Sequence, residues 1–224
     1  MDDLKIVLTV AQKDLRQELR SRAVTIATVF FAAIVLVVLA FAIGPSEAAM
    51  RAAAPGVLWV ALAFAGVISA AQSYQNELEE GALEQLLLYP VPRASIFLGK
   101  LLANWLYMSV LGALLIIVTG LLFGANFLRG YGMLLLTVAL GTLGFALIAT
   151  FYAALTANLR ARESLLPVLM FPVVVPVLQA AVRASGAVVS GDWPVARDWL
   201  QLLTGFDLVY FVTCTALFHF VTEA

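Results

Sequence analysis

Apolar runs separated by short polar segments dominate the pattern of residues along this chain. Five of the runs contain no charged residue and have about the 20-residue length that a helix needs to cross the hydrocarbon core of a bilayer. They are residues 23–43, 55–74, 101–123, 131–155 and 164–182. A sixth run of similar length, 200–220, includes Asp207 and His219. The pattern predicts an all-α membrane protein with six transmembrane helices. The sixth run also fits a re-entrant piece up to Thr204 followed by a span from Asp207.

The segments between these runs are short, and none is long enough to fold as a catalytic domain. They are residues 44–54, 75–100, 124–130, 156–163 and 183–199. We therefore expect a single six-helix transmembrane domain over residues 23–222, with residues 75–100 as its longest loop.

The first 22 residues carry a pattern of their own. Apolar residues recur there at the spacing of one helix face, with basic residues among them. The apolar positions are Leu4, Val7, Leu8, Ala11, Leu15 and Leu19, and the basic ones are Lys5, Lys13, Arg16 and Arg20. This pattern predicts an amphipathic helix at 1–22 that lies in the membrane interface. A plain solvated helix is the alternative.

The composition agrees with a membrane chain and excludes several functions. Hydrophobic residues make up 63% of the sequence and charged residues 12%, whereas soluble domains carry about 25% charged residues, so a water-soluble enzyme is excluded. A net charge of −1 provides no basic field for nucleic acid. The single cysteine, Cys214, allows neither an intrachain disulfide nor a CxxC pair. In its apolar run we interpret it as a small buried residue.

The positions of lysine and arginine predict the orientation, because cytoplasmic loops of membrane proteins retain an excess of these residues. With residues 1–22 placed inside, nine of the 13 basic residues lie on cytoplasmic segments and four lie on the other side. The four are Arg51, Arg129, Arg183 and Arg197. With six spans, both termini are then cytoplasmic.

The loop at 75–100 has the features of a short helix that a soluble partner would bind. Asn76, followed three residues later by Glu79, fits a helix N-cap with its capping-box partner. An apolar face then follows, and prolines stop the helix. The face is Leu83, Leu86 and Leu87, the prolines are Pro90 and Pro92, and the glutamates are Glu77, Glu79, Glu80 and Glu84. This acidity favours a docking helix for the groove of a soluble protein over the alternative, a re-entry helix resting on lipid.

The sequence contains no motif for ATP hydrolysis or proteolysis. A P-loop requires G-x-x-x-x-G-K-[ST]. Around the Gly99-Lys100 pair, Ala94 replaces the first glycine and Leu101 the hydroxyl residue. The H-E-x-x-H and G-x-S-x-G signatures are also absent. We expect a non-catalytic subunit that binds no cofactor directly and obtains ATP hydrolysis from a partner.

Two ionisable residues in the sixth run are candidate functional groups. A carboxylate at the bilayer centre costs about 2.5–3.5 kcal/mol on insertion scales, so such a residue usually has a role. Asp207 either caps a helix at the outer interface, faces a cavity or forms a structural pair. His219, near the inner end, is either structural or a ligand for haem or a metal. Both are candidates for contact with haem, and no metal site is predicted.

Proline and glycine residues in the fourth and fifth runs predict a helix pair that can pivot. Pro172 and Pro176 lie four residues apart on one helical face, and Pro167 opens the run. Proline inside a span removes backbone hydrogen bonds and bends the helix. Gly141 and Gly144 in the preceding run allow close helix approach. We predict a helix hinge at the three prolines.

Four stretches of the chain resemble one protein family. The first is the loop, through Glu80, Gly81, Leu83, Glu84, Gln85, Leu86, Leu87 and Pro90 and on to Gly99-Lys100. It resembles the coupling segment of type-2 ABC exporter permeases. The other three are Ala54-Pro55-Gly56 with Trp59, Arg162-Glu163 with Leu166-Pro167, and Phe171-Pro172 with Pro176. Together they resemble the CcmB family, the haem exporter permeases of cytochrome c maturation, over residues from about 54 to 180. Asp207 and His219 lie outside this likeness.

The resemblance implies a permease subunit in the bacterial inner membrane. In this family a permease dimer sits on two copies of a separate ATPase subunit, CcmA, and works with CcmC, the small CcmD and the periplasmic haem chaperone CcmE. ATP hydrolysis by CcmA would be coupled, through the loop residues, to haem export or to release of haem-loaded CcmE, with haem as the cargo. A type-2 permease that exports a drug, lipid or glycan is the first alternative. A membrane scaffold without ATP coupling is the second.

Overall fold

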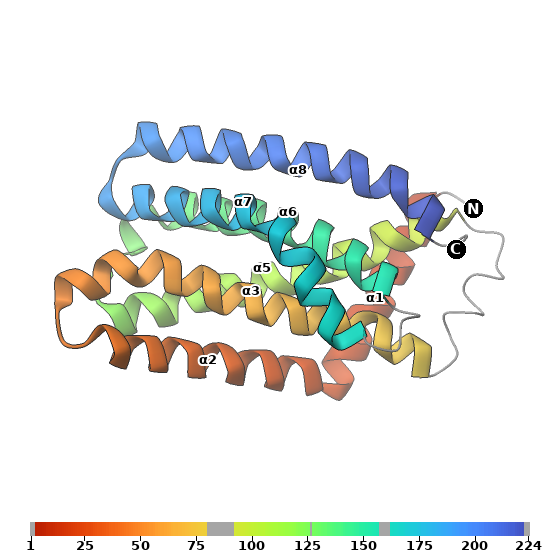
Figure 1. Ribbon diagram of the computed structural model, residues 1–224, viewed down its shortest axis with the longest axis horizontal. Coiled ribbons are helices and arrows are strands. Elements are labelled where there is room, and N and C mark those ends of the chain that lie inside the picture. Colours follow the sequence, from red (N-terminus) through yellow and green to blue (C-terminus); the bar gives the residue numbers. More distant parts are fainter. Residues whose placement is uncertain (1–2, 80–91, 126, 157–161, 222–224) are drawn as a thin grey trace.

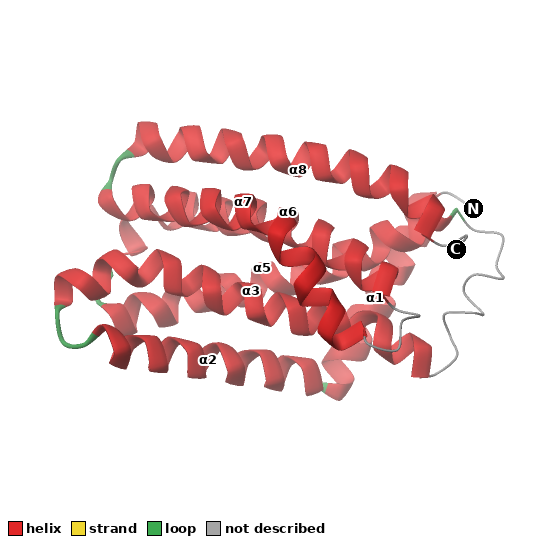
Figure 2. Ribbon diagram, in the orientation of Figure 1, coloured by secondary structure: helices red, strands yellow, loops and turns green. Residues whose placement is uncertain are grey.

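The computed structural model describes residues 3–79, 92–125, 127–156 and 162–221. Within these ranges the regular structure is helical, as Figure 2 shows. The helices are α1 (Asp3–Ser21), α2 (Ala23–Ile43), α3 (Glu47–Glu79), α5 (Arg93–Phe123), α6 (Tyr131–Thr156), α7 (Arg162–Ser190) and α8 (Trp193–Val221), with a 3-10 helix at Phe127–Gly130. Six helices in the described ranges, from α2 to α8, are long and apolar enough to cross a membrane. This confirms the predicted all-α membrane fold with six spans.

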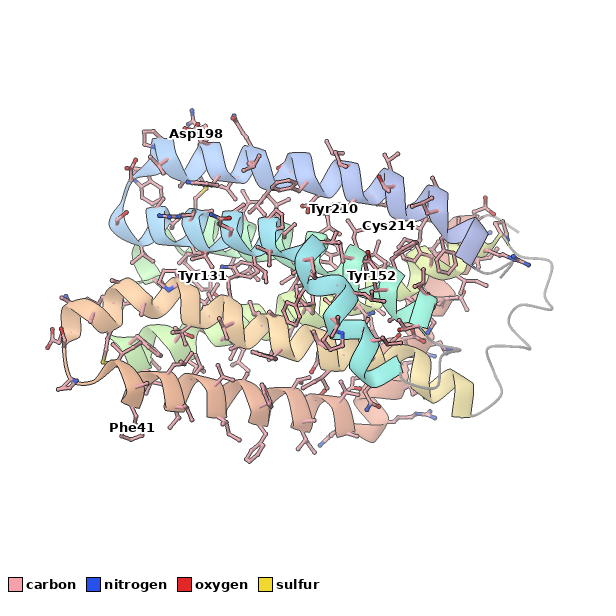
Figure 3. The ribbon with its side chains drawn as sticks, in the orientation of Figure 1. Phe41, Tyr131, Tyr152, Asp198, Tyr210 and Cys214 are labelled. Atoms are coloured by element: carbon pink, nitrogen blue, oxygen red, sulfur yellow. The ribbon has the colours of Figure 1, made fainter. Side chains whose placement is uncertain are left out.

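The six long helices run up and down in one bundle, and α1 lies across one end of it (Figure 1). Helix α6 is central, because it packs against α3, α5, α7 and α8. In the most apolar stretch of α6, 67% of the residues are buried, whereas the corresponding share in α2, at the edge of the bundle, is 17%. Phe41 on α2 points away from the bundle (Figure 3) and is 83% exposed. Such apolar outer faces suit a hydrocarbon surrounding.

Small residues let the central helices approach one another closely. At Gly141 on α6, an added Cβ would collide with the indole of Trp59 on α3. The Trp59 ring nitrogen donates a hydrogen bond of 2.9 Å to the Ser185 hydroxyl of α7. A tryptophan indole therefore joins three helices, and the predicted role of Gly141 in close helix packing is confirmed.

The helices on either side of the longest loop are longer than the apolar runs indicated. Helix α3 begins at Glu47 rather than at residue 55, and it continues through Asn76 to Glu79. The prediction of Asn76 as the N-cap of a separate helix is therefore wrong. Helix α5 begins at Arg93 and includes Lys100, so the expected loop at 75–100 is shorter at both ends.

The predicted connection at 183–199 is also wrong. Helix α7 continues past Arg183 to Ser190, and α8 begins at Trp193. The turn between them is made by Gly191, at φ +80°, and Asp192. Helix α8 then runs without a break through Asp207, which excludes the re-entrant alternative for the sixth run. Both helices include exposed charged residues near their ends, Arg183 in α7 and Arg197 in α8.

Candidate functional site

The residues predicted to contact an ATPase subunit lie outside the described residues. They are Glu80, Gly81, Leu83, Glu84, Leu86, Leu87 and Pro90. The structure does describe the helices that enter and leave this stretch, α3 ending at Glu79 and α5 beginning at Arg93. The candidate site in the described residues consists of the contacts that hold these two helix ends.

A buried lysine joins the two helices to α1. The Lys100 side chain on α5 is fully buried. Its ammonium nitrogen lies 3.0 Å from the backbone carbonyl of Ser73 on α3, 3.4 Å from the Ser73 hydroxyl and 3.2 Å from a carboxylate oxygen of Asp14 on α1. Burying a charge is costly unless it is paired and hydrogen-bonded. We call Asp14, Ser73 and Lys100 the lysine cluster.

Helix α1 packs on α5 directly beside this cluster. Its buried residues are Ile6, Val10 and Ala11. At Gly99 on α5, an added Cβ would lie 2.6 Å from the Cβ of Val10, so this glycine is what permits the close contact. The predicted helix is confirmed, but its apolar face is divided, because Leu4 is 69% exposed. Its position in the membrane interface remains a prediction.

A sharp elbow connects α1 to α2, and a glutamate holds it. Arg22 adopts the left-handed conformation, at φ 52°, which is uncommon for a residue with a side chain. A carboxylate oxygen of Glu18 accepts hydrogen bonds from the Thr25 backbone N–H at 2.7 Å and the Thr25 hydroxyl at 2.5 Å. Three residues later, the Thr28 hydroxyl is hydrogen-bonded to the Tyr107 hydroxyl of α5. The elbow is therefore tied to the same helix as the lysine cluster.

A polar cavity of about 50 Å³ lies between α1, α2, α3 and α5 at this elbow. Its volume and polar walls suit ordered water, which needs a cavity of about 10–15 Å³ and two to four partners. The polar side chains in its lining are Asp14, Gln17, Glu18, Ser69, Gln72, Ser73, Asn104 and Tyr107. The lysine cluster is thus one part of a larger polar region at the end of an otherwise apolar bundle.

Hydrogen bonds extend this polar region into the centre of the bundle. The Ser69 hydroxyl of α3 donates to the Asn104 carbonyl oxygen of α5 at 3.4 Å, and the Asn104 amide donates to the Thr150 hydroxyl of α6 at 3.0 Å. Further along the same pair of helices, the Trp105 ring nitrogen donates to the Ala139 carbonyl at 2.8 Å. A displacement of α5 would therefore strain or move α6 through these hydrogen bonds.

All three predicted hinge prolines, Pro167, Pro172 and Pro176, lie inside helix α7. Figure 1 shows α7 changing direction along its length, as expected where prolines remove hydrogen bonds from a helix. Val173 lies between Pro172 and Pro176, and its carbonyl accepts a hydrogen bond of 3.0 Å from the Tyr210 hydroxyl of α8. Figure 3 shows Tyr210 between α8 and α7. The structure thus places the prolines in a bent helix, and their action as a hinge remains a prediction.

Asp207 lies in the interior of α8, which rules out one of the three alternatives for it, a helix cap at the outer interface. Its side chain is 5% exposed, and neither carboxylate oxygen has a hydrogen-bond partner among the described residues. It packs on α6, where a Cβ added at Gly144 would lie 2.5 Å from one oxygen, and Val177 lies beside it. The predicted close approach at Gly144 is confirmed, and contact of Asp207 with haem stays a prediction.

Two further residues of α8, Cys214 and His219, were singled out by the sequence. Cys214 is free and buried, as predicted. His219 belongs to α8, but its side chain lies outside the described part of the chain, so its candidacy for haem contact stays a prediction.

Sequence reasoning missed the lysine cluster. The Gly99-Lys100 pair fails the phosphate-binding signature, and the predicted loop ends at Lys100. A usable signal was present, since Lys100 stands directly before a long apolar run and follows Gly99. A lysine that enters the membrane-spanning part of a helix usually pairs with another polar group. Its partners Asp14 and Ser73 are far away in sequence and carry no pattern that points to them.

Comparison with known proteins gives a consistent result. A family model described as CcmB protein matches residues 5–222. The chain is 33% identical to a protein of Pseudomonas aeruginosa named heme exporter protein B, over 80% of each chain. It is 30% identical to proteins of the same name from Bradyrhizobium diazoefficiens, over 90% of each chain, and from Haemophilus influenzae, over 77% of this chain and 78% of that protein.

Proposed function

Because the chain belongs to the CcmB protein family, we propose that it is the membrane permease subunit of an ABC transporter complex for cytochrome c biogenesis. A separate ATPase subunit, CcmA, hydrolyses ATP, and the permease couples that hydrolysis to haem export or to release of the haem-loaded chaperone CcmE. The family match over nearly the whole chain carries this proposal. The six-span helical bundle agrees with it.

Coupling begins at residues 80–90. The apolar side chains Leu83, Leu86 and Leu87 enter a groove of the ATPase subunit, and Glu80 and Glu84 stay at its polar rim. The segment is joined to α3 and α5, whose ends are held together by the lysine cluster. A push on the segment therefore moves α1, α3 and α5 together rather than bending one helix.

The motion continues from α5 into α6 and α7. The Asn104–Thr150 hydrogen bond connects α5 to α6, and α6 packs closely against α7. Helix α7 responds at Pro167, Pro172 and Pro176, because a helix that lacks backbone hydrogen bonds bends at lower cost. The permease contributes no catalytic group, binds no cofactor of its own and takes haem only as cargo.

The assembly is a homodimer on two CcmA subunits, in contact with CcmC, CcmD and the chaperone CcmE, in the bacterial inner membrane. Both termini face the cytoplasm, which follows from the excess of lysine and arginine on that side. Two reporters fused after Ala224 test this orientation. One that functions only in the cytoplasm should be active, and one that functions only in the periplasm should be inactive. The reverse result would mean that the orientation or the number of spans is wrong.

A deletion strain tests the function. Loss of this chain should abolish covalent haem staining of c-type cytochromes, and the chain supplied in trans should restore it. If the complex releases loaded chaperone, haem-bound CcmE should accumulate in the deletion strain. Normal cytochrome c staining without the chain would contradict the proposal, and would favour a permease for another substrate.

A further inference from the structure

A second cavity lies at the end of the bundle where α7 turns into α8. It is open to the outside, has a volume of about 370 Å³ and is lined by the start of α3, the end of α7 and the start of α8. Small-molecule pockets in proteins have volumes of about 300–1,000 Å³, so this space is large enough for part of a ligand. The coupling function described above does not use it.

Gly186 on α7 keeps this cavity open. A Cβ added at Gly186 would have no atom within 4 Å. This glycine therefore differs from Gly141 and Gly144, where Trp59 and Asp207 occupy the space that a side chain would need. Close helix packing does not explain it, and the space beside it is unfilled.

The lining combines one cationic group with an apolar wall. Arg183 is exposed and has no carboxylate within ion-pair distance in the described ranges. The one acidic group in the lining, Asp192, accepts a hydrogen bond from the Val195 backbone N–H at 3.3 Å, at the start of α8. Pro55 and Trp199 contribute apolar surface. A guanidinium group binds carboxylates and phosphates through paired hydrogen bonds.

We propose that this cavity binds an anionic amphiphile, with its acid group at Arg183 and its apolar body along Pro55, Val195 and Trp199. Two sources offer that chemistry. One is the phosphate headgroup of a membrane phospholipid, whose oxygens a guanidinium group binds through paired hydrogen bonds. The other is a porphyrin that carries carboxylates. The porphyrin source rests on the proposed function, whereas the lipid source does not.

Two substitutions test the site in the full-length purified chain. Arg183→Gln removes the cation at an exposed position, and Gly186→Leu fills the cavity without meeting a neighbouring atom at its Cβ. Arg197→Gln is the matched control, because Arg197 is exposed on α8 near the same turn and does not line the cavity. Native mass spectrometry measures binding of two probes, phosphatidylglycerol and protoporphyrin. Circular dichroism verifies that each variant keeps its helices.

Arg183→Gln should weaken binding of one probe about tenfold or more, since hydrogen bonds to charged groups are worth that much. Gly186→Leu should weaken binding of the same probe, because its side chain occupies the space beside Arg183. The control should bind as the unsubstituted chain does. The probe that is affected identifies the source. If either test variant binds both probes normally, or if the control weakens binding equally, the site does not exist. The deletion strain reports on the proposed function separately, because cytochrome c staining can depend on the chain whether or not the cavity binds a probe.

Discussion

Replacing Lys100 by methionine should loosen the end of the bundle that carries residues 80–90. Methionine preserves most of the side-chain length and removes the ammonium group. The Ser73 carbonyl then loses a donor at 3.0 Å, and the Asp14 carboxylate loses one at 3.2 Å. Breaking a fully buried ion pair costs about 3–5 kcal/mol, and a hydrogen bond to a charged group about 1.5–3 kcal/mol.

Asp14 lowers the expected cost of this substitution. Its side chain keeps 13% of its surface exposed and retains Lys13, whose nitrogen lies 3.2 Å from the other carboxylate oxygen. We therefore expect a loss of about 2–3 kcal/mol in the free energy of unfolding. Lys13→Met is the matched control. Lys13 is 41% exposed, and surface ion pairs contribute about 0–1 kcal/mol.

The assay is unfolding of the purified chain in mixed micelles, followed by circular dichroism. A double-mutant cycle with Asp14→Asn isolates the contact between the two charged groups, and its interaction energy should be at least about 0.5 kcal/mol. Lys100→Arg should recover part of the loss, because it restores the charge. Equal stability of Lys100→Met and Lys13→Met would refute the structural role of the cluster.

Three further predictions concern α6, α7 and α8. Gly144→Ala should destabilise the chain by about 1–3 kcal/mol, because the new methyl group meets Asp207 and Val177; Gly132→Ala on the same helix, where no atom lies within 4 Å, should change stability by less than about 0.5 kcal/mol. Asp207→Ala should leave stability unchanged or raise it by up to about 2 kcal/mol, since it removes a buried carboxyl group with no hydrogen bond in the described structure. A loss above about 1 kcal/mol would reveal a stabilising partner. Pro172→Ala with Pro176→Ala should preserve assembly with the ATPase and reduce release of haem-loaded chaperone, and an unchanged cytochrome c yield would remove the hinge role.

The sequence predicts the number and type of spans well, because apolar runs of the length of a bilayer rarely occur in soluble domains. Helix α6, at Tyr131–Thr156, almost coincides with its run at 131–155. Helices α7 and α8 extend beyond theirs because Arg183 and Arg197 are exposed at helix ends, where a charged side chain reaches water or headgroups at little cost. Counting residues up to the first charge cannot locate such ends.

The contacts around the candidate site were harder to predict, because they depend on pairing between distant segments. Nothing local to Lys100 indicates that Asp14 and Ser73 will meet it. The same limit applied to Asp207. Its position is decided by packing against Gly144 of α6, which no local pattern around Asp207 indicates. Local pattern thus predicts the helices, and tertiary packing determines which polar residues they bury.

The central claim is that residues 80–90 couple this permease to an ATPase subunit, and one substitution tests it most directly. Leu86→Asp with Leu87→Asp places two charges on the predicted docking face, which is Leu83, Leu86 and Leu87. Gln85→Asp adds one charge outside that predicted face and serves as the control. The measurement is copurification of CcmA with the permease, together with ATP-dependent release of haem-loaded CcmE. The double variant should lose both, and the control should keep both. Copurification and ATP-dependent release that match the unsubstituted chain would contradict the coupling assignment.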